Sequence, residues 1–307
     1  MITKLMANKN TTSFKSISKP KFSLLSKRYN SSLALIRQNK GKNNEKDPDL
    51  GFYLAGLIEG DGYISITKEN RVILGIVFNI KDQPLAVKLL NFLGKGFIAK
   101  RKSNSIELRF SEKKTIIRIV NLINGKIRTP KIDQLHKLID WLNNKHFMDI
   151  PKLPVDESPL HQNSWLAGFI EADGGFYIRH SLKQIICKFS LEQRMIYPKT
   201  LESYEPILNQ ICLFLNVKLA TRNRSDNKNS YYIVRVENQK SIKILITYLN
   251  KYSLLSSKYL DFLDWVDSFN IIFKKAHMTD QGRETILSHK NNMNDKRTYF
   301  NWDHLDF

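Results

Sequence analysis

The sequence predicts an α+β protein made of two repeats related by an approximate twofold, each with the element order αββαββαα and its own antiparallel sheet. Three observations support this prediction. The nonapeptide LAGLIEGDG at 54–62 returns as LAGFIEADG at 166–174. An alternating run of apolar and polar residues follows each copy, which is typical of a strand with one buried face. A Pro-rich stretch at 151–159 separates the two copies, as expected of a linker.

The elements of the two repeats correspond one to one. After the nonapeptide helix, the first repeat is predicted to have its strands and helices at 63–67, 72–80, 85–93, 97–101, 106–110, 113–122 and 132–142. The matching elements of the second repeat are predicted at 176–179, 185–191, 201–215, 217–221, 231–236, 241–249 and 259–273.

The chain therefore divides into five predicted parts. These are a basic leader (1–48), a first repeat (49–147), a linker (148–163), a second repeat (164–273) and a C-terminal tail (274–307). The tail is polar and weakly patterned, and no element is predicted in it. Two copies of so long a unit do not suit a solenoid. They suit a partner that is itself nearly twofold symmetric, such as duplex DNA.

The chain carries a large excess of positive charge. Lys and Arg number 49 and Asp and Glu 29 among 307 residues, which gives a formal net charge of +20. Such a field suits a polyanion, although AT-rich coding DNA also favours Lys, Asn and Ile. No apolar run approaches the roughly 20 residues that span a bilayer. We therefore expect a soluble protein. The charge leaves DNA, RNA or an anionic membrane surface open as the partner, and together with the duplication it leads us to expect a nucleic acid and no membrane.

The leader has a composition of its own. Residues 1–44 contain ten basic residues and no Asp or Glu, and they are rich in Ser, Lys and Asn. This composition is typical of a mitochondrial transit peptide, and the sequence RYNSS at 28–32 is similar to a processing site. The leader therefore predicts a mitochondrial location. A disordered basic leader translated from flanking sequence is the alternative.

The two cysteines give no sign of redox or metal chemistry. Cys187 and Cys212 lie inside the apolar stretches IICKF and QICLFL. Cysteines in such surroundings are predicted to be small buried apolar residues, and not a disulfide or a zinc site. The seven His show no metal-ligand spacing.

Each nonapeptide is predicted to form a buried helix that packs against its counterpart, because its apolar residues point to nearly every side. Gly56 and Gly60 lie four residues apart, as do Gly168 and Ala172. A Gly inside a helix costs about 1 kcal/mol relative to Ala. Small residues kept at this spacing therefore indicate close contact between the two helix backbones.

Asp61 and Asp173 end the two predicted helices, each before a Gly suited to a helix C-terminus. If the helices pack side by side, the two carboxylates lie together at the unfavourable end of both helix dipoles. A divalent cation would relieve this repulsion, and oxygen ligands of this kind suit Mg²⁺ or Mn²⁺. Asp-Gly is also a common turn signal, but its occurrence in both copies favours a metal site.

Both nonapeptides resemble the LAGLIDADG motif of homing endonucleases and intron maturases, and the repeated element order resembles that family's fold over about residues 50–273. The resemblance implies that the motif helices form the interface between the halves and that the two sheets form a DNA-binding saddle. It implies that Asp61 and Asp173 bind divalent metal together with the backbone carbonyls of Gly60 and Ala172. Glu59 and Glu171, at the motif's sixth position, are not the catalytic carboxylates on this resemblance.

The resemblance also implies four further catalytic residues. Gln193 and Asp82 follow the second strand of each repeat, where the family has Gln or sometimes Asp to position solvent. The departure from Gln at Asp82 implies that the two DNA strands are cut at unequal rates. Lys131 and Lys258 match a basic residue before the last helix that stabilises charge on the phosphate. An ordinary solvated charge at a helix start is the alternative for either lysine.

Readout of the DNA sequence is implied for polar side chains on the solvent faces of the strands. Solubilising charge is the alternative role for some of them. The candidates are Ser65, Thr67, Arg71, Arg101, Glu107, Arg109, Arg179, Lys183, Lys188, Arg222, Arg224 and Arg235.

The sequence thus predicts a monomeric, metal-dependent endonuclease that hydrolyses one phosphodiester in each strand of a long, pseudo-palindromic site in double-stranded DNA. The first alternative is an intron maturase that binds host intron RNA and assists splicing, with or without DNA cleavage. The second alternative is a non-catalytic DNA-binding regulator, which would be expected to have lost Asp61 or Asp173. An unrelated basic α+β protein would not explain two matching nonapeptides.

Overall fold

A computed structural model describes residues 48–223 and 230–305 of the chain. The expected transit peptide with its processing sequence, and the candidate Arg224, lie outside the described residues.

The first half carries every element predicted for the first repeat. It contains α2 (Pro48–Asp61), β1 (Gly62–Ile66), β2 (Val72–Asn79), α3 (Gln83–Leu93), β3 (Phe97–Lys100), β4 (Ser105–Phe110), α4 (Lys113–Ile123) and α5 (Ile132–His146). Its strands form a four-stranded sheet in the order β1-β2-β4-β3, with every neighbouring pair antiparallel.

The second half repeats this arrangement. It contains α6 (Trp165–Asp173), β5 (Gly174–His180), β6 (Ile185–Arg194), α7 (Glu205–Leu215), β7 (Leu219–Asn223), β8 (Ser230–Val236), α8 (Gln239–Lys251) and α9 (Lys258–Phe273). The sheet order β5-β6-β8-β7 matches that of the first half strand for strand. The predicted fold class and duplicated element order are confirmed.

Three local features differ from the sequence prediction. Helix α7 begins at Glu205 and not at 201, because Leu201 adopts a left-handed conformation with a φ of 63° and Pro206 occupies the first turn. Strand β7 lies two residues later than predicted. The tail forms a helix that was not predicted, α10 (Asp280–Asn291), which the side chain of Thr279 caps and which packs on α9 and β5.

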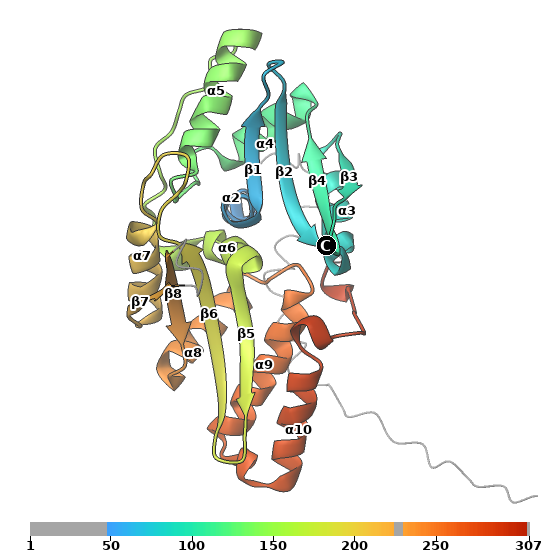
Figure 1. The fold of residues 1–307 in the computed structure, drawn as a ribbon, viewed down its shortest axis with the longest axis vertical. Helices are drawn as coiled ribbons and strands as arrows, with labels where there is room; N and C mark the ends of the chain where they lie inside the picture. Colours follow the sequence, from blue (N-terminus) through green and yellow to red (C-terminus); the bar gives the residue numbers. More distant parts are fainter. Residues whose placement is uncertain (1–47, 224–229, 306–307) are drawn as a thin grey trace, which may run out of the picture.

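The motif helices α2 and α6 pack against each other between the two sheets (Figure 1). A methyl group added at Gly56 would overlap the carbonyl oxygen of Trp165, and one added at Gly168 would overlap the carbonyl oxygen of Tyr53. Only Gly permits this approach of the two backbones. The small residues therefore explain why the two helix ends, and the aspartates on them, come together.

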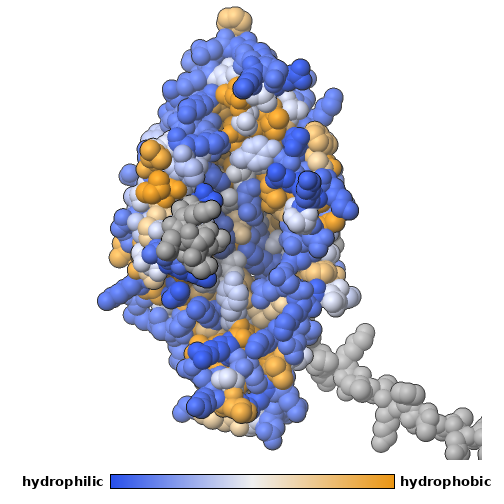
Figure 2. Space-filling model, viewed as in Figure 1, coloured by the Kyte–Doolittle hydropathy of each residue, from blue (hydrophilic) through white to orange (hydrophobic). Residues whose placement is uncertain are grey.

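Each sheet has an apolar face and a polar face. The buried face of β2 carries Leu74, Ile76 and Phe78, and helices of the same half cover it. The view in Figure 2 shows a surface that is mostly hydrophilic, with small apolar areas scattered over it. Cys187 and Cys212 are both buried, as predicted. None of the helices in the described part of the chain is both long and apolar enough to cross a membrane.

Candidate active site between the two motif helices

Asp61 and Asp173 are the last residues of α2 and α6, and the structure brings them together. A methyl group added at Gly60 would lie 3.2 Å from Oδ2 of Asp173, so the end of one motif helix touches the aspartate of the other. The charge of Asp61 also acts on Asp173 and raises its pKa. The side chain of Asp61 is open to solvent on one side, while protein surrounds most of the rest.

The protein surroundings make ionisation of both carboxylates costly. Burial first, and the charge of Asp61 second, raise the pKa of Asp173 to about 7, although two lysines and a hydrogen bond from Gln193 oppose the shift. Burial likewise raises the pKa of Asp61. Two carboxylates that resist joint ionisation form a site that a bound cation would stabilise.

Both lysines lower the pKa of both motif aspartates, and the lysine of the other half acts more strongly on each. Lys258 is the strongest charge that lowers the pKa of Asp61, and Lys131 is the strongest that lowers the pKa of Asp173. We therefore distinguish two sites. The first site consists of Asp61, Asp82, Ala172 and Lys258, which line a common hollow of about 350 Å³. The second site consists of Asp173, Gln193, Gly60 and Lys131.

The two lysines bind the C-terminal ends of the motif helices. Nζ of Lys131 donates to the carbonyl oxygens of Ile58, Gly60 and Gly62 at 3.2, 3.1 and 2.8 Å. Nζ of Lys258 lies 3.0, 2.7, 3.3 and 2.6 Å from those of Ile170, Glu171, Ala172 and Gly174, which share its three N–H donors. A cation is favourable at the negative end of a helix dipole. Neither lysine is therefore an ordinary solvated charge at a helix start, which was the alternative considered from the sequence.

Glu59 and Glu171 hold the loops that precede these lysines. Glu59 is fully buried and accepts hydrogen bonds from the backbone amides of Arg128 and Thr129 and from the indole of Trp165 in the other motif helix. The second half repeats the pattern. Glu171 accepts from the amide of Leu255, the hydroxyl of Ser256 and the hydroxyl of Tyr53 in the first motif helix.

Sequence reasoning excluded these glutamates from catalysis but missed their positioning role. The signal was present, because a carboxylate at the same place in two apolar helices must find buried partners.

Gln193 and Asp82 are not structural equivalents, although the sequence suggested that they are. Gly62 pairs with Ile76 in the first sheet and Gly174 pairs with Leu191 in the second, so Gln193 corresponds to Phe78. Asp82 lies four residues further along, at the end of the 3-10 turn Ile80–Asp82.

Both side chains nevertheless lie next to a motif aspartate. Nε2 of Gln193 donates to Oδ2 of Asp173 at 3.0 Å. Oδ1 of Asp82 accepts from the amide of Ser257 at 2.8 Å, and Asp82 lines the same hollow as Asp61. Burial raises the pKa of Asp82. The two sites therefore obtain their additional polar group from different positions of the fold.

Most candidate DNA contacts lie on the polar faces of the two sheets or in their hairpins. Strand register places Arg109 opposite Gly75 and Phe97 in the first sheet, and Arg235 opposite Ser190 in the second. The candidates on these faces or in the hairpins with an exposed or partly exposed side chain are Ser65, Thr67, Arg71, Arg101, Arg109, Arg179, Lys183, Lys188, Arg222 and Arg235.

Glu107 differs from this group. It lies on the polar face, but only 1% of the residue is exposed. Nη2 of Arg109 donates to it at 2.8 Å, the hydroxyl of Tyr63 donates to it, and Nε of Arg101 lies 3.8 Å away. The prediction that Glu107 faces solvent is wrong, because two arginines and a tyrosine cover its carboxylate. It holds the arginines in place on the polar face of the sheet.

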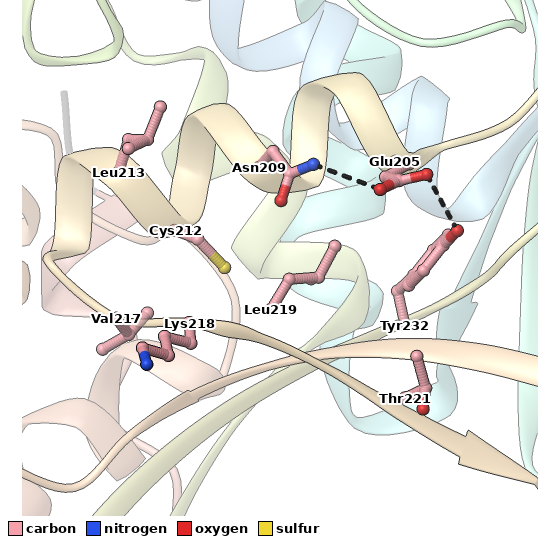
Figure 3. Close-up of a pocket in the computed structure, with 9 residues that line it drawn as sticks. All are labelled: Glu205, Asn209, Cys212, Leu213, Val217, Lys218, Leu219, Thr221 and Tyr232. Carbon is pink, nitrogen blue, oxygen red and sulfur yellow. Dashed lines mark hydrogen bonds between the residues drawn. The ribbon is translucent and has the colours of Figure 1, made fainter.

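A second hollow of about 390 Å³ lies between α7 and the strands β7 and β8 (Figure 3). Glu205 accepts hydrogen bonds there from Asn209 and Tyr232. Glu205 is the one carboxylate among its described lining residues, and none of them also lines the hollow beside Asp61. This hollow therefore lacks the paired carboxylates on which the site at the motif helices depends.

Comparisons with known proteins identify the family. The family model of the LAGLIDADG endonucleases matches residues 54–142 and 166–269. The chain belongs to the LAGLIDADG endonuclease family, as the resemblance of the two nonapeptides predicted.

Among its relatives, the intron-encoded DNA endonuclease aI3 of Saccharomyces cerevisiae is 33% identical over 326 aligned positions, which cover 91% of this chain and 78% of that protein. The intron-encoded RNA maturase bI4 of the same yeast is 28% identical over 244 positions, which cover 76% of this chain and 35% of that protein. The crystal structure of the I-LtrWI LAGLIDADG homing endonuclease bound to target DNA has the same fold. Its TM-score is 0.64 at 21% identity, with 83% of this chain and 100% of that chain covered.

Proposed function

We propose that this protein is a site-specific endonuclease that hydrolyses one phosphodiester in each strand of a long, pseudo-palindromic site in double-stranded DNA. The observation that carries the proposal is the pair of motif aspartates, Asp61 and Asp173, which end two packed helices whose carbonyl oxygens each hold a lysine. Two similar sites related by an approximate twofold suit the two strands of a duplex, whose backbones are related in the same way. Since one chain supplies both halves, a monomer suffices.

The donor groups between the motif helices fit a hard divalent cation such as Mg²⁺ or Mn²⁺. Two carboxylates and the carbonyl oxygens of Gly60 and Ala172 are the oxygen ligands that such ions prefer. Within the described ranges no cluster of three or more His, Cys, Asp and Glu side chains gathers, so backbone carbonyls, water and DNA phosphates would complete the coordination. When bound, the metal supplies Lewis-acid polarisation of a water molecule and of the phosphodiester.

The chain's own residues prepare this chemistry. The side-chain amide of Gln193 orients Asp173 by donating a hydrogen bond to its carboxylate. Oε1 of Gln193 in turn accepts from the backbone amide of Arg194 at 2.9 Å. Asp82, held by the amide of Ser257, would orient water at the first site. Lys131 and Lys258, fixed by their carbonyl partners, would stabilise negative charge that develops on the phosphate.

The polar faces of the sheets would supply affinity and sequence preference. Their arginines and lysines attract phosphates at long range and can pair with base edges in the major groove. The expected partner is therefore duplex DNA. The basic, Ser-rich leader supports a mitochondrial location.

A second candidate function is that of an intron maturase, alone or together with cleavage. The observation that favours it is the 28% identity to an RNA maturase over 76% of this chain. A non-catalytic DNA-binding regulator fits less well, because both motif aspartates and both lysines are present.

The test is a cleavage selection. Residues 45–307 with Mg²⁺ are offered a randomised duplex library beside the Asp61→Asn/Asp173→Asn variant. Specific cuts in both strands by the wild type alone support the endonuclease and reveal its site. If the wild type makes no cuts and instead binds a structured intron RNA tightly, the maturase replaces the endonuclease as the function.

A further inference from the structure

The C-terminal segment 293–305 returns from α10 to the first site. It lies beyond the residues that the family model matches. Met293 and Leu305 at its two ends are buried, with exposed fractions of 2% and 5%. In Figure 1 this segment, in red, runs from α10 towards the first half, where the chain end is marked. It is therefore anchored by a buried residue at each end.

The start of the segment contributes to the wall of the first site. Asn294 and Asp295 line the same hollow as Asp61, Asp82 and Lys258. Nζ of Lys81 lies 3.5 Å from the carbonyl oxygen of Asn294 and 4.0 Å from Oδ1 of Asp295. The tail thus contacts the turn that carries Asp82.

The middle of the segment is fixed to α9, the helix that begins with Lys258. Arg297 donates from Nε to Oδ1 of Asp261 at 2.9 Å and from Nη2 to Oδ2 of Asp264 at 2.5 Å. The amide of Asn294 donates to the same oxygen of Asp261 at 3.1 Å. The side chains of Arg297 and Asp261 are only 12% and 5% exposed, so water competes little with this ion pair.

The end of the segment forms hydrogen bonds with the loop before Lys258. Nε2 of His304 lies 3.1 Å from the carbonyl oxygen of Leu255 and 3.3 Å from that of Ser256, and it donates to them. The imidazole also stacks on the ring of Tyr259, with 4.5 Å between centroids. On its other side the same loop is held by Glu171 and Asp82. The position of Lys258 therefore depends on the motif helix, on Asp82 and on the tail.

The loop before Lys131 is braced by a different segment. The amide of Asp156 donates to the carbonyl oxygen of Ile127 at 2.8 Å, and Nη2 of Arg128 donates to the carbonyl oxygen of Ser158 at 2.7 Å. Arg128 also forms an ion pair with Asp156. These partners belong to the linker. Each lysine loop is therefore braced by the chain that follows its own half, and the described part of the tail contacts the Lys258 loop and not the Lys131 loop.

We propose that the segment 293–305 is a positioning element of the first site: it holds Lys258 in place and narrows access to Asp61 and Asp82. Its loss would then slow cleavage of one DNA strand and spare the other. This inference rests on the proposed function. Arg297 and His304 act through the Lys258 loop and are positioning residues.

The test uses the full chain and a cognate duplex with a different dye on each strand, so that single-turnover rates are measured for both strands. Lys258→Met first identifies the strand that the first site cuts. His304→Ala and Arg297→Ala should slow that strand by about tenfold, because small displacements of a catalytic group are costly. The other strand should change by less than about twofold. Asp156→Ala should give the reverse pattern, and the exposed Thr298→Ala should change neither strand.

Equal slowing of both strands by the His304 and Arg297 variants, or slowing of neither, would overturn the proposal. Amide hydrogen exchange gives a second measurement that does not depend on cleavage. In His304→Ala the amides of Leu255 and Ser257 should exchange faster, while those of Arg128 and Thr129 should not change. Unchanged exchange at Leu255 and Ser257 also overturns the proposal. If the wild type cuts neither strand, the proposed function fails, and the exchange result alone decides whether the tail braces the loop.

Discussion

The first and second sites contain the same kinds of central group but differ in the residues around them. Each has a motif aspartate, a backbone carbonyl from the other motif helix, and a lysine fixed by carbonyl oxygens. The first site also contains Asp82, and Asn294 and Asp295 of the C-terminal segment line its hollow. The second site adds Gln193 from within strand β6. The aspartate, the backbone carbonyl and the lysine are duplicated, while the residues around them differ.

The helices that follow the two lysines show the same difference. Gln134 and Asp261 each lie three residues after a lysine. Gln134 donates to the hydroxyl of Tyr197, in the long connection between β6 and α7, and accepts from the amide of Ile64 at 3.0 Å. Asp261 instead binds the tail. Equivalent positions of the two halves thus bind different segments of the chain.

The largest expected effect is the loss of DNA cleavage when either motif aspartate is replaced. Asp61→Asn should reduce cleavage of both strands by about a thousandfold or more, because Asp61 and Asp173 lie together and metal held between the two sites would lose one of its two carboxylates. Asp173→Asn should do the same. Binding of the cognate duplex, measured by gel shift in Ca²⁺, should survive in both variants. Cleavage at the wild-type rate by either variant would remove its aspartate from the site.

The next largest effect is on the stability of the packed motif helices, which should fall by similar amounts when either helix is changed. Gly56→Ala and Gly168→Ala each place a methyl group against a backbone carbonyl of the facing helix. Each should lower the free energy of unfolding by about 1–3 kcal/mol, the usual cost of overpacking. Urea unfolding measures both. A large loss for one variant and none for the other would show that the motif helices are not packed symmetrically.

The raised pKa of Asp173 should make the stability of the folded protein depend on pH, which is a smaller effect. The folded state holds this proton up to a pH of about 7, whereas the unfolded chain releases it near 4. In a chelator the wild type should therefore lose stability as pH rises between these values. Asp173→Asn removes this loss, so its melting temperature should exceed that of the wild type by more at pH 8 than at pH 5.

The control for this prediction is added Ca²⁺. It should raise the melting temperature of the wild type and not that of Asp173→Asn, because a ligand stabilises only the form that binds it. The facing groups Asp61, Lys131 and Lys258 are unchanged in both proteins. A pH-independent difference between them would mean that burial of Asp173 does not favour its protonated form.

The smallest expected effect is on DNA affinity, when an arginine on the polar face of the second sheet is replaced. Arg235→Ala should weaken binding by about 1 kcal/mol and reduce the salt dependence of the affinity by about one phosphate contact. Fluorescence anisotropy at several salt concentrations measures both. Lys240→Ala, on α8, changes the net charge equally and should leave the salt dependence as it is. Equal behaviour of the two variants would mean that Arg235 acts only through overall charge.

Much of the fold and the centre of the site could be predicted because they depend on local, repeated sequence. The small residues of the nonapeptides require close helix packing, and that packing alone brings Asp61 and Asp173 together. The equivalence of Asp82 and Gln193 failed because it counted residues after a strand, whereas hydrogen-bonded register decides which residues correspond.

The tail could not be placed from the sequence. Its anchors, Arg297 on α9 and His304 on the Lys258 loop, are contacts between residues that are far apart in the chain. Such contacts leave no periodic pattern. The one local signal was Thr279, which caps α10. The burial of Glu107 was missed for the same reason, because its cover comes from Tyr63 on another strand.

The central claim is that each strand is cut by a site assembled across the interface, with one lysine for each site. The most direct test measures single-turnover cleavage of both strands of a two-colour cognate duplex by Lys131→Met and Lys258→Met, after their folding has been checked by melting temperature and DNA binding. We expect each variant to slow a different strand by about tenfold or more, since each lysine stabilises charge at one phosphate. If both variants slow the same strand, or both strands equally, the two-site account is contradicted.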